Sequence, residues 1–111
     1  MDILFATRRL EKRLSSQAEL VRTFGAVRAK VLRRRLDQLR AADNLAVLRS
    51  LPGRCHELTQ DRKGQLAIDL DGPNRLIFEP ADSPPPAKDN GGLDWERVVA
   101  IRVLEVEDYH G

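Results

Sequence analysis

Residues 55–81 read CHELTQDRKGQLAIDLDGPNRLIFEPA, and this stretch decides the fold class. It contains three apolar runs of strand length, CHELT, GQLAIDL and RLIFEPA, and the links QDRKG and DGPN have the composition of turns. Strands joined by such short links pair antiparallel, because a parallel pair needs a crossover of about a dozen residues or more. The stretch therefore predicts an antiparallel meander.

The residues before the meander predict helices that pack on it. Ser16 and Glu19 have the spacing of a capping box, in which each side chain bonds to the backbone N–H of the other residue. Behind them one apolar stripe recurs with helical period: Phe24, Val27, Val31, Leu32, Leu36 and Leu39. We expect Gly25 to weaken this helix and to kink it. Residues 2–6 predict a short strand, 7–14 a helical segment, and 44–51 one or two turns capped by Asn44.

The end of the chain, WERVVAIRVLEVEDY at 95–109, predicts one long strand. Alternation divides its last residues between two faces: Leu104, Val106, Asp108 and His110 on one, and Glu105, Glu107 and Tyr109 on the other. The ending is therefore better interpreted as a placed cluster than as a ragged tail. With residues 82–94 as an exposed Pro/Gly loop outside the chemistry, the prediction is one α+β domain over 1–111, its helices on an antiparallel-dominated sheet.

Composition limits the class of protein. With 111 residues, 41% hydrophobic and 32% charged, the chain supports a single domain with a small aliphatic core. No apolar run approaches the roughly 20 residues that span a bilayer, and MDILFATRRLEKR does not resemble a signal peptide. A single cysteine, Cys55, excludes an internal disulfide and a cysteine zinc site. We expect a cytoplasmic protein without metal, cofactor or membrane contact.

Charge is distributed unevenly along the chain. Residues 1–63 carry fifteen Lys and Arg against seven Asp and Glu, whereas residues 64–111 carry four against ten. A basic half joined to an acidic half indicates a polyanionic partner. A solvated helix surface that is merely basic explains the same counts equally well.

The residue types present suit metal-free cleavage of RNA. That reaction needs an acid and a base for the proton transfers and cations for the charge that develops on the phosphate. Histidine titrates near neutral pH, and the arginine fork matches phosphate oxygens. The candidates are His56, Arg62, Lys63, Arg75, Asp108, Tyr109 and His110. Alternatives stay open: packing for His56, an ion pair with Asp69 or Asp71 for Arg75, and an edge-strand aromatic for Tyr109.

An ordered set of motifs resembles the HigB branch of the RelE/ParE toxins, the plasmid maintenance killer type of toxin–antitoxin toxin. It comprises LRRRLDQLRAADNLAVLRSLPG at 32–53, HEL before DRKGQ, the R-x-I-F strand at 75–78, and the terminal DYH. The resemblance spans about residues 4–111. Two features depart from it: Asn74 stands where an aromatic residue is usual, and the loop 82–94 is longer than a tight turn.

The resemblance implies a RelE-like fold and a toxin that cuts mRNA in the ribosomal A site. Arg75 matches the arginine that binds the scissile phosphate, His56 the sheet histidine, and Asp108, Tyr109 and His110 the terminal cluster. The basic residues expected to contact RNA or the ribosome are Lys30, Arg33, Arg34, Arg35, Arg62 and Lys63. The implied protein partner is a helix-turn-helix antitoxin, HigA-like. Two alternatives remain: a ParE-like toxin that acts on gyrase, and an inactive basic relative that binds RNA or ribosomes.

Overall fold

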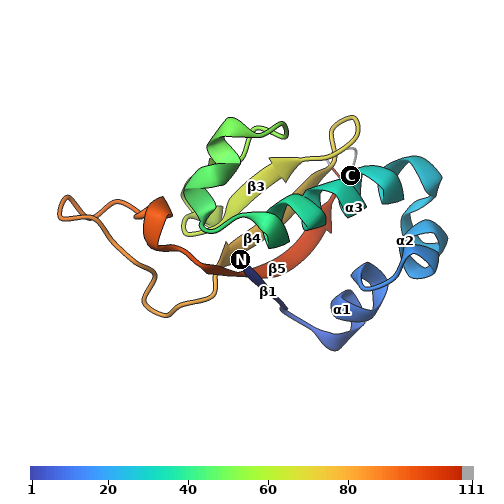
Figure 1. Cartoon of the computed structure of the whole chain (residues 1–111), viewed down its shortest axis with the longest axis horizontal. Coiled ribbons are helices and arrows are strands. Elements are labelled where there is room, and N and C mark those ends of the chain that lie inside the picture. The colour runs from blue at the N-terminus through green and yellow to red at the C-terminus, as the bar shows by residue number, and fades with distance from the viewer. Residues whose placement is uncertain (109–111) are drawn as a thin grey trace.

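A five-stranded mixed sheet organises the computed structural model, which describes residues 1–108 (Figure 1). The strands are β1 Asp2–Phe5, β2 His56–Glu57, β3 Leu66–Asp69, β4 Arg75–Pro80 and β5 Ala100–Glu107, in the order β1-β5-β4-β3-β2. All neighbours pair antiparallel except β1 and β5, which are parallel. The predicted α+β class, with an antiparallel-dominated sheet and the meander at its centre, is confirmed.

The helices begin and end where the local sequence satisfies their free backbone groups. In residues 1–108 they are α1 Arg8–Leu14, α2 Gln17–Phe24 and α3 Ala26–Ala41, with 3₁₀ turns η1 Leu45–Ser50, η2 Gln60–Arg62 and η3 Trp95–Arg97. The Thr7, Ser16 and Asn44 side chains accept N-cap hydrogen bonds at α1, α2 and η1. None of these helices is long and apolar enough to cross a membrane.

Two details of the helical region differ from the prediction. The capping box forms only by half, because the Glu19 carboxylate accepts from the guanidinium of Arg22 at 2.6 Å and not from its own helix start. Gly25 does more than kink one helix: with φ of +83°, which favours glycine, it ends α2 and begins α3.

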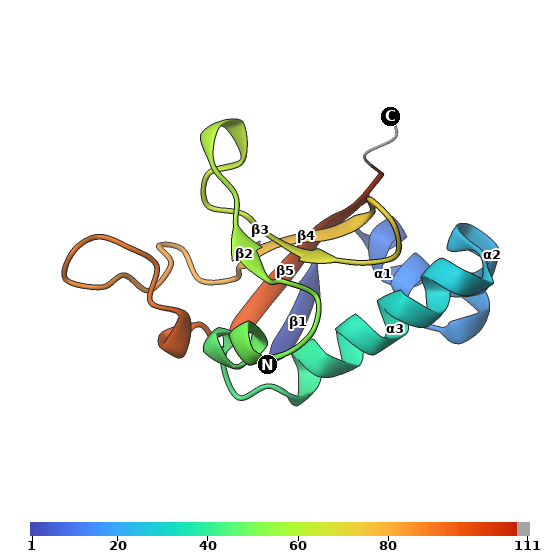
Figure 2. The ribbon, with the colours of Figure 1, turned by 90° about the horizontal axis from the view of Figure 1, so that it is seen from above.

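Helix α3 lies along one face of the sheet and supplies most of the helical side of the core (Figure 2). Ala29, Leu32, Leu36 and Leu39 point from α3 into the core and are at most 1% exposed. The sheet meets them with Ile68, Leu76, Phe78, Ile101 and Val103, each fully buried. The predicted packing of helices on the sheet is confirmed for α3, while α2 packs on α3 and α1.

A β-bulge in β5 decides which of its side chains face α3. Phe78 pairs with Val103, but the preceding residue, Ile77, pairs with Glu105, so Leu104 is an extra residue in the ladder. Without it, strict alternation after Val103 would point Glu105 into the helical core. With it, Val106 packs against the core and the two glutamates face the other side.

The last strand is shorter than predicted at its start. Residues 95–97 form η3, because the Trp95 ring is buried against the core and its indole Nε1 donates to Glu57 at 3.0 Å. The Arg49 guanidinium lies 4.0 Å from the centre of the same ring. Strand β5 ends at Glu107 and is followed by exposed Asp108. Tyr109 and His110 lie outside the described residues.

Residues 82–94, here called the proline arm, extend from one end of the sheet (Figures 1 and 2). The arm folds back on itself: Lys88 N donates to Gly92 O at 2.7 Å, and Asp94 N donates to Pro86 O at 3.0 Å. Most of its residues are exposed, as predicted, while Leu93 packs against the core. The arm therefore has a defined shape of its own.

Arg35 is buried at the junction of α3 with the sheet. Its Nε donates to Asp69 O at 2.9 Å, and its Nη1 donates to Gln38 Oε1 at 3.2 Å. The guanidinium covers Gly53, where an added Cβ would lie 2.9 Å from Arg35 Nε. Burial, and then the neighbouring charge of Arg34, lower the pKa of Arg35. The prediction that Arg35 belongs to an RNA-contacting surface is therefore wrong, because its side chain is buried and its Nε and Nη1 donate inside the fold.

We expect Arg35→Ala to lower the free energy of unfolding by about 2–3 kcal/mol, because it leaves buried acceptors without their charged donor. The matched variant Arg34→Ala, at the exposed neighbouring position, should change it by no more than about 0.5 kcal/mol. Urea denaturation followed by circular dichroism measures both. Equal losses in the two variants would contradict the structural role of Arg35.

Candidate functional site

The face of the sheet turned away from α3, here called the open face, carries two rows of cross-strand neighbours. One row is His56, Ala67, Ile77 and Glu105, and the other is Asp69, Arg75 and Glu107. Side chains at directly paired positions lie on the same face of a sheet. The β-bulge in β5 is what brings the two glutamates into these rows.

A cavity of about 460 Å³ lies on the open face. His56, Arg75 and Glu107 line it from the sheet. Arg62, in η2, and the preceding residues 57–61 line its other side. Figure 2 shows the 58–65 connection and the C-terminal end of β5 projecting on the side opposite α3. The meander thus supplies the histidine and both arginines from segments close in sequence, and β5 supplies the carboxylate.

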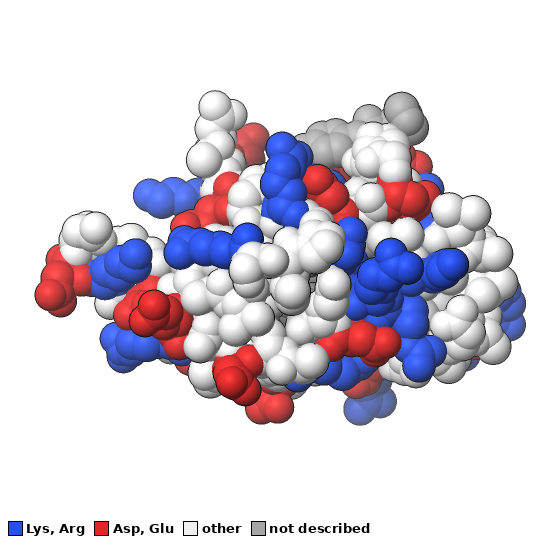
Figure 3. Space-filling view, turned by 45° about the horizontal axis from the view of Figure 1, so that its top comes forward, with Lys and Arg blue, Asp and Glu red and all other residues white. Residues whose placement is uncertain are grey.

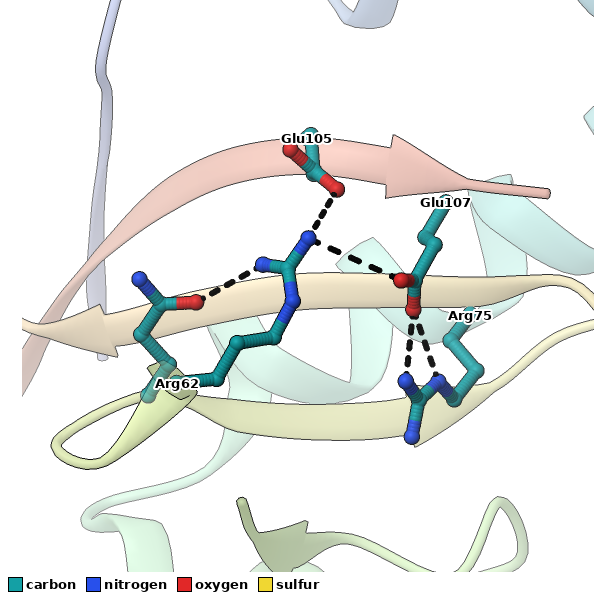
Figure 4. A network of polar contacts seen from close by, with 5 residues as sticks. Arg62, Arg75, Glu105 and Glu107 are labelled. Carbon is teal, nitrogen blue, oxygen red and sulfur yellow. Dashed lines mark hydrogen bonds and ion pairs between the residues drawn. The ribbon is translucent and has the colours of Figure 1, made fainter. Parts of the chain in front are cut away.

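The two arginines are held by two glutamates (Figure 4). Arg62 Nη2 donates to Glu105 Oε1 at 2.8 Å and lies 3.6 Å from Glu107 Oε1. Arg75 donates from Nε at 3.0 Å and from Nη2 at 2.6 Å to the other oxygen of Glu107. Glu107 therefore bridges both guanidinium groups with its two carboxylate oxygens.

Burial makes the pair between Arg75 and Glu107 the strongest contact of this network. Their side chains are 11% and 19% exposed, whereas Arg62 and Glu105 are 34% and 45% exposed. Shielding from water strengthens an ion pair and makes either charge costly to leave alone. Phosphate oxygens match the same guanidinium fork as a carboxylate does. An anionic ligand that binds Arg75 here must replace the contact with Glu107 or share it.

His56 is oriented by the backbone of the residue two positions before it. Its Nδ1 lies 2.7 Å from Arg54 O, and because a carbonyl oxygen only accepts, Nδ1 carries the proton of this bond. In the neutral ring Nε2 then has the lone pair that takes up a proton. Arg54 itself has φ of +51°, a left-handed conformation that is uncommon outside glycine. The contact with Arg54 O therefore fixes the tautomer of the neutral ring, with the proton on Nδ1 and the lone pair on Nε2.

Cys55 faces the opposite side of β2 from His56. It packs against the hydrophobic core, and burial raises the pKa of its thiol to about 12. The thiol is therefore neutral at physiological pH and is not a nucleophile. As predicted, Cys55 packs against the core, where it is half-buried.

The structure brings some of the predicted site residues together and separates others. His56, Arg62 and Arg75 share the cavity, Lys63 lines an adjoining one, and Asp108 follows directly after Glu107. Glu105 and Glu107 are absent from the predicted set. Glu105 and Glu107 alternate with Val106 along the strand, and this pattern could have predicted that they face away from the core on the open face. Arg75 is paired with Glu107, and Asp69 is paired with Arg54 at 3.1 Å.

The basic residues of α3 lie on the other side of the sheet from the cavity. Lys30, Arg33 and Arg34 are exposed and line one shallow depression with Asp37. Figure 3 shows Lys and Arg side chains gathered over α3. Asp37 Oδ2 lies 3.4 Å from Arg33 Nε, which reduces the local positive charge. This surface is separate from the open-face cavity.

Asn74 stands where the resembled toxins usually have an aromatic side chain, and it has a structural task here. It is 4% exposed, and its Nδ2 donates to Asp71 O at 2.9 Å across the turn between β3 and β4. Its backbone N–H donates to the same carbonyl at 3.1 Å. The residue before Arg75 therefore closes a turn and presents no flat surface to a ligand.

The side chains of the site determine what it can bind. Two guanidinium groups suit a phosphate, an imidazole suits proton transfer, and the carboxylates set the charge around both. Within residues 1–108 no group of three or more His, Cys, Asp or Glu side chains is arranged to hold a metal ion. No protein-family model matches the chain, and no curated protein matches it.

We expect Glu107→Gln to tighten the binding of inorganic phosphate by on the order of tenfold, because it removes a negative charge from beside Arg62 and Arg75. Glu79→Gln is the matched control, since Glu79 pairs with Arg102 across the same two strands at 3.0 Å but does not line the cavity. Isothermal titration with phosphate at low salt measures both variants. Weaker binding by Glu107→Gln would show that Glu107 positions Arg75 and does not compete with the anion.

Proposed function

We propose that this protein is a toxin of the RelE/ParE type, HigB branch, that cuts mRNA on the ribosome and is neutralised by a helix-turn-helix antitoxin. One observation supports the nuclease activity above all others. His56, Arg62 and Arg75 line a single cavity, and the chain continues from its edge through Glu107 toward Asp108, Tyr109 and His110. Three of the side chains proposed for metal-free RNA cleavage, His56, Arg62 and Arg75, are thus on one face of the fold.

In this proposal the scissile phosphate binds between the two arginines in exchange for the carboxylate of Glu107. Arg75 stabilises the charge that develops on the phosphate, because its fork is already positioned and shielded from water. His110 or Asp108 takes part in proton transfer at the 2′-hydroxyl or at the leaving 5′-oxygen. His56 and Tyr109 orient the reacting groups or assist, and Nε2 is the atom of His56 that accepts a proton.

The second candidate is a basic relative that binds RNA or ribosomes without cutting. Two observations favour it: both arginines of the cavity are paired with glutamates, and Asn74 is turned inward at the position where an aromatic residue would face a base. Such a protein binds RNA in a salt-dependent manner and leaves it intact. Cleavage assays on translated mRNA separate it from the nuclease.

We expect Arg75→Ala to lower mRNA cleavage by about 10²–10³-fold, the typical effect of losing one preorganised charge donor. Arg102→Ala is the matched control, because Arg102 is also paired with a glutamate across β4 and β5 but lies outside the cavity. Primer extension on mRNA from a purified translation reaction measures both variants. If Arg102→Ala loses as much cleavage as Arg75→Ala, general disruption of the sheet explains the result.

Deleting His110 and Gly111 should abolish growth arrest and mRNA cleavage, since a proton-transfer group typically contributes about 10²–10⁴-fold in rate. His110→Ala should do the same, and its melting temperature, compared with that of the parent, shows whether the variant still folds. Cleavage at the parental rate by the truncated chain would remove His110 from the site. Growth arrest without mRNA cleavage would favour the gyrase-directed alternative.

The basic surface of α3 has its own test. Replacing Lys30, Arg33 and Arg34 with Gln should weaken ribosome binding and flatten its salt dependence, because each neutralised phosphate releases counterions. We expect the slope of log affinity against log salt to fall by about one per lost contact. Replacing exposed Arg8, Arg9 and Lys12 of α1 with Gln makes the same change in net charge. Equal effects in the two triple variants would mean that only net charge matters.

A further inference from the structure

A second cavity, of about 550 Å³, lies between the proline arm and the connection from β2 to β3. The arm contributes Pro85, Pro86 and Leu93, and Gly91 and Gly92 add bare backbone to this wall. The opposite wall includes Thr59, Gln65 and Lys63. The cavity is mostly apolar, with a few hydrogen-bonding side chains on one wall, which is the usual character of a small-molecule or base-binding site.

This cavity adjoins the cavity on the open face. The two share the segment 57–60, which passes between them as a common wall. The far side of this segment faces Arg62 and Arg75, to which the proposed function assigns the phosphate. A polymer whose phosphate lies at the arginines therefore has this apolar cavity as the next space along the protein.

We propose that the cavity formed with the proline arm binds a nucleobase of single-stranded RNA, from the nucleotide next to the phosphate held by Arg62 and Arg75. This inference deepens the proposed function and rests on RNA being the ligand there. It reverses the expectation, drawn from the sequence of the arm, that residues 82–94 lie apart from the site. The arm thus supplies a base-binding wall.

Three features of the cavity fit a base. Its apolar wall of proline rings and glycine backbone accommodates a flat heterocycle, and the Thr59 hydroxyl can donate to or accept from the base edge. Gln65 adds its amide N–H donors, because its Oε1 already accepts from Arg62 Nη1 at 2.9 Å. Lys63 is exposed and adds a positive charge where a following phosphate would lie. An unpaired strand can turn one base into such a cavity at the lowest cost, since a base in a duplex must first be unpaired and unstacked.

The position of Asn74 explains why a base would need the cavity at the proline arm. With Asn74 buried in a turn, the residue before Arg75 provides no surface for a base. The cavity at the proline arm offers that surface from the other side of the 57–60 segment. The two departures of this sequence from the resembled toxins, Asn74 and the long arm, thus find one common explanation.

The test uses the full-length protein and a short single-stranded RNA in which an abasic residue replaces each nucleotide in turn. Binding is measured by fluorescence anisotropy at low salt, without ribosomes. We expect one abasic position to weaken binding about fivefold or more and the others to have small effects, since one buried base contributes a large part of the affinity. Ala87→Trp, at an exposed position that lines the cavity, should fill it and remove this dependence on position.

Asp89→Trp is the control, because Asp89 is exposed on the same arm and does not line the cavity. It should keep the positional profile of the parent. If Ala87→Trp does not fold, the series of abasic RNAs measured on the parent protein still tests the base site. Equal weakening at every abasic position, a profile unchanged by a folded Ala87→Trp, or no binding of RNA would each overturn the base site.

The outcomes separate this inference from the proposed function. A positional profile in a protein that cuts no mRNA would keep the base site and reject the nuclease. Loss of mRNA cleavage in Arg75→Ala, with no positional profile in the parent, would keep the nuclease and reject the base site. The binding profile therefore tests the base site, and the cleavage assay tests the nuclease.

Discussion

The single extra residue at Leu104 is the constraint on which the site depends. Strand β5 must bury Ile101 and Val103 under α3 and must also bury Val106, which strict alternation would place on the opposite face from Val103. The bulge resolves this conflict by shifting the phase of the strand once. As a consequence Glu105 and Glu107 face away from the core, beside Arg62 and Arg75. The packing of the core and the charge of the open face are therefore set by the same irregularity.

Glu105 and Glu107 together offset the charges of the two cavity arginines. Glu107 contacts both guanidinium groups and Glu105 contacts Arg62, so the positive charge that a phosphate would meet is already compensated. The cost of separating the shielded pair of Arg75 and Glu107 has to be offset by the incoming anion and by contacts elsewhere on the ligand. A ligand with several contact points, such as an RNA strand, can offset that cost, while a single phosphate has only the arginines. The exposed cations of α3 lie on the opposite side of the sheet, so a partner that reaches both must be large.

Charged groups beside the site also make contacts that hold the fold together. Arg35 holds the carbonyl of Asp69, and the side chain of Asp69 pairs with Arg54, whose own carbonyl accepts from His56. These contacts link α3, the segment before β2 and strand β3 to the imidazole. A continuous series of polar contacts thus runs from the helix residue Arg35 to His56.

Local patterns in the sequence determined the elements: turn residues separate the strands of the meander, Ser16 caps α2, and period-two alternation puts His56 and Cys55 on opposite faces of β2. These features depend on neighbours along the chain, so the residues alone predict them. The bulge at Leu104, the burial of Arg35 over Gly53 and the pairing of Arg75 with Glu107 were decided by the tertiary structure. Each needs the register of a distant strand or the approach of a distant segment. An arginine read from sequence carries the same charge whether its donors are spent inside the fold or face a ligand, and only packing distinguishes Arg35 from Arg34.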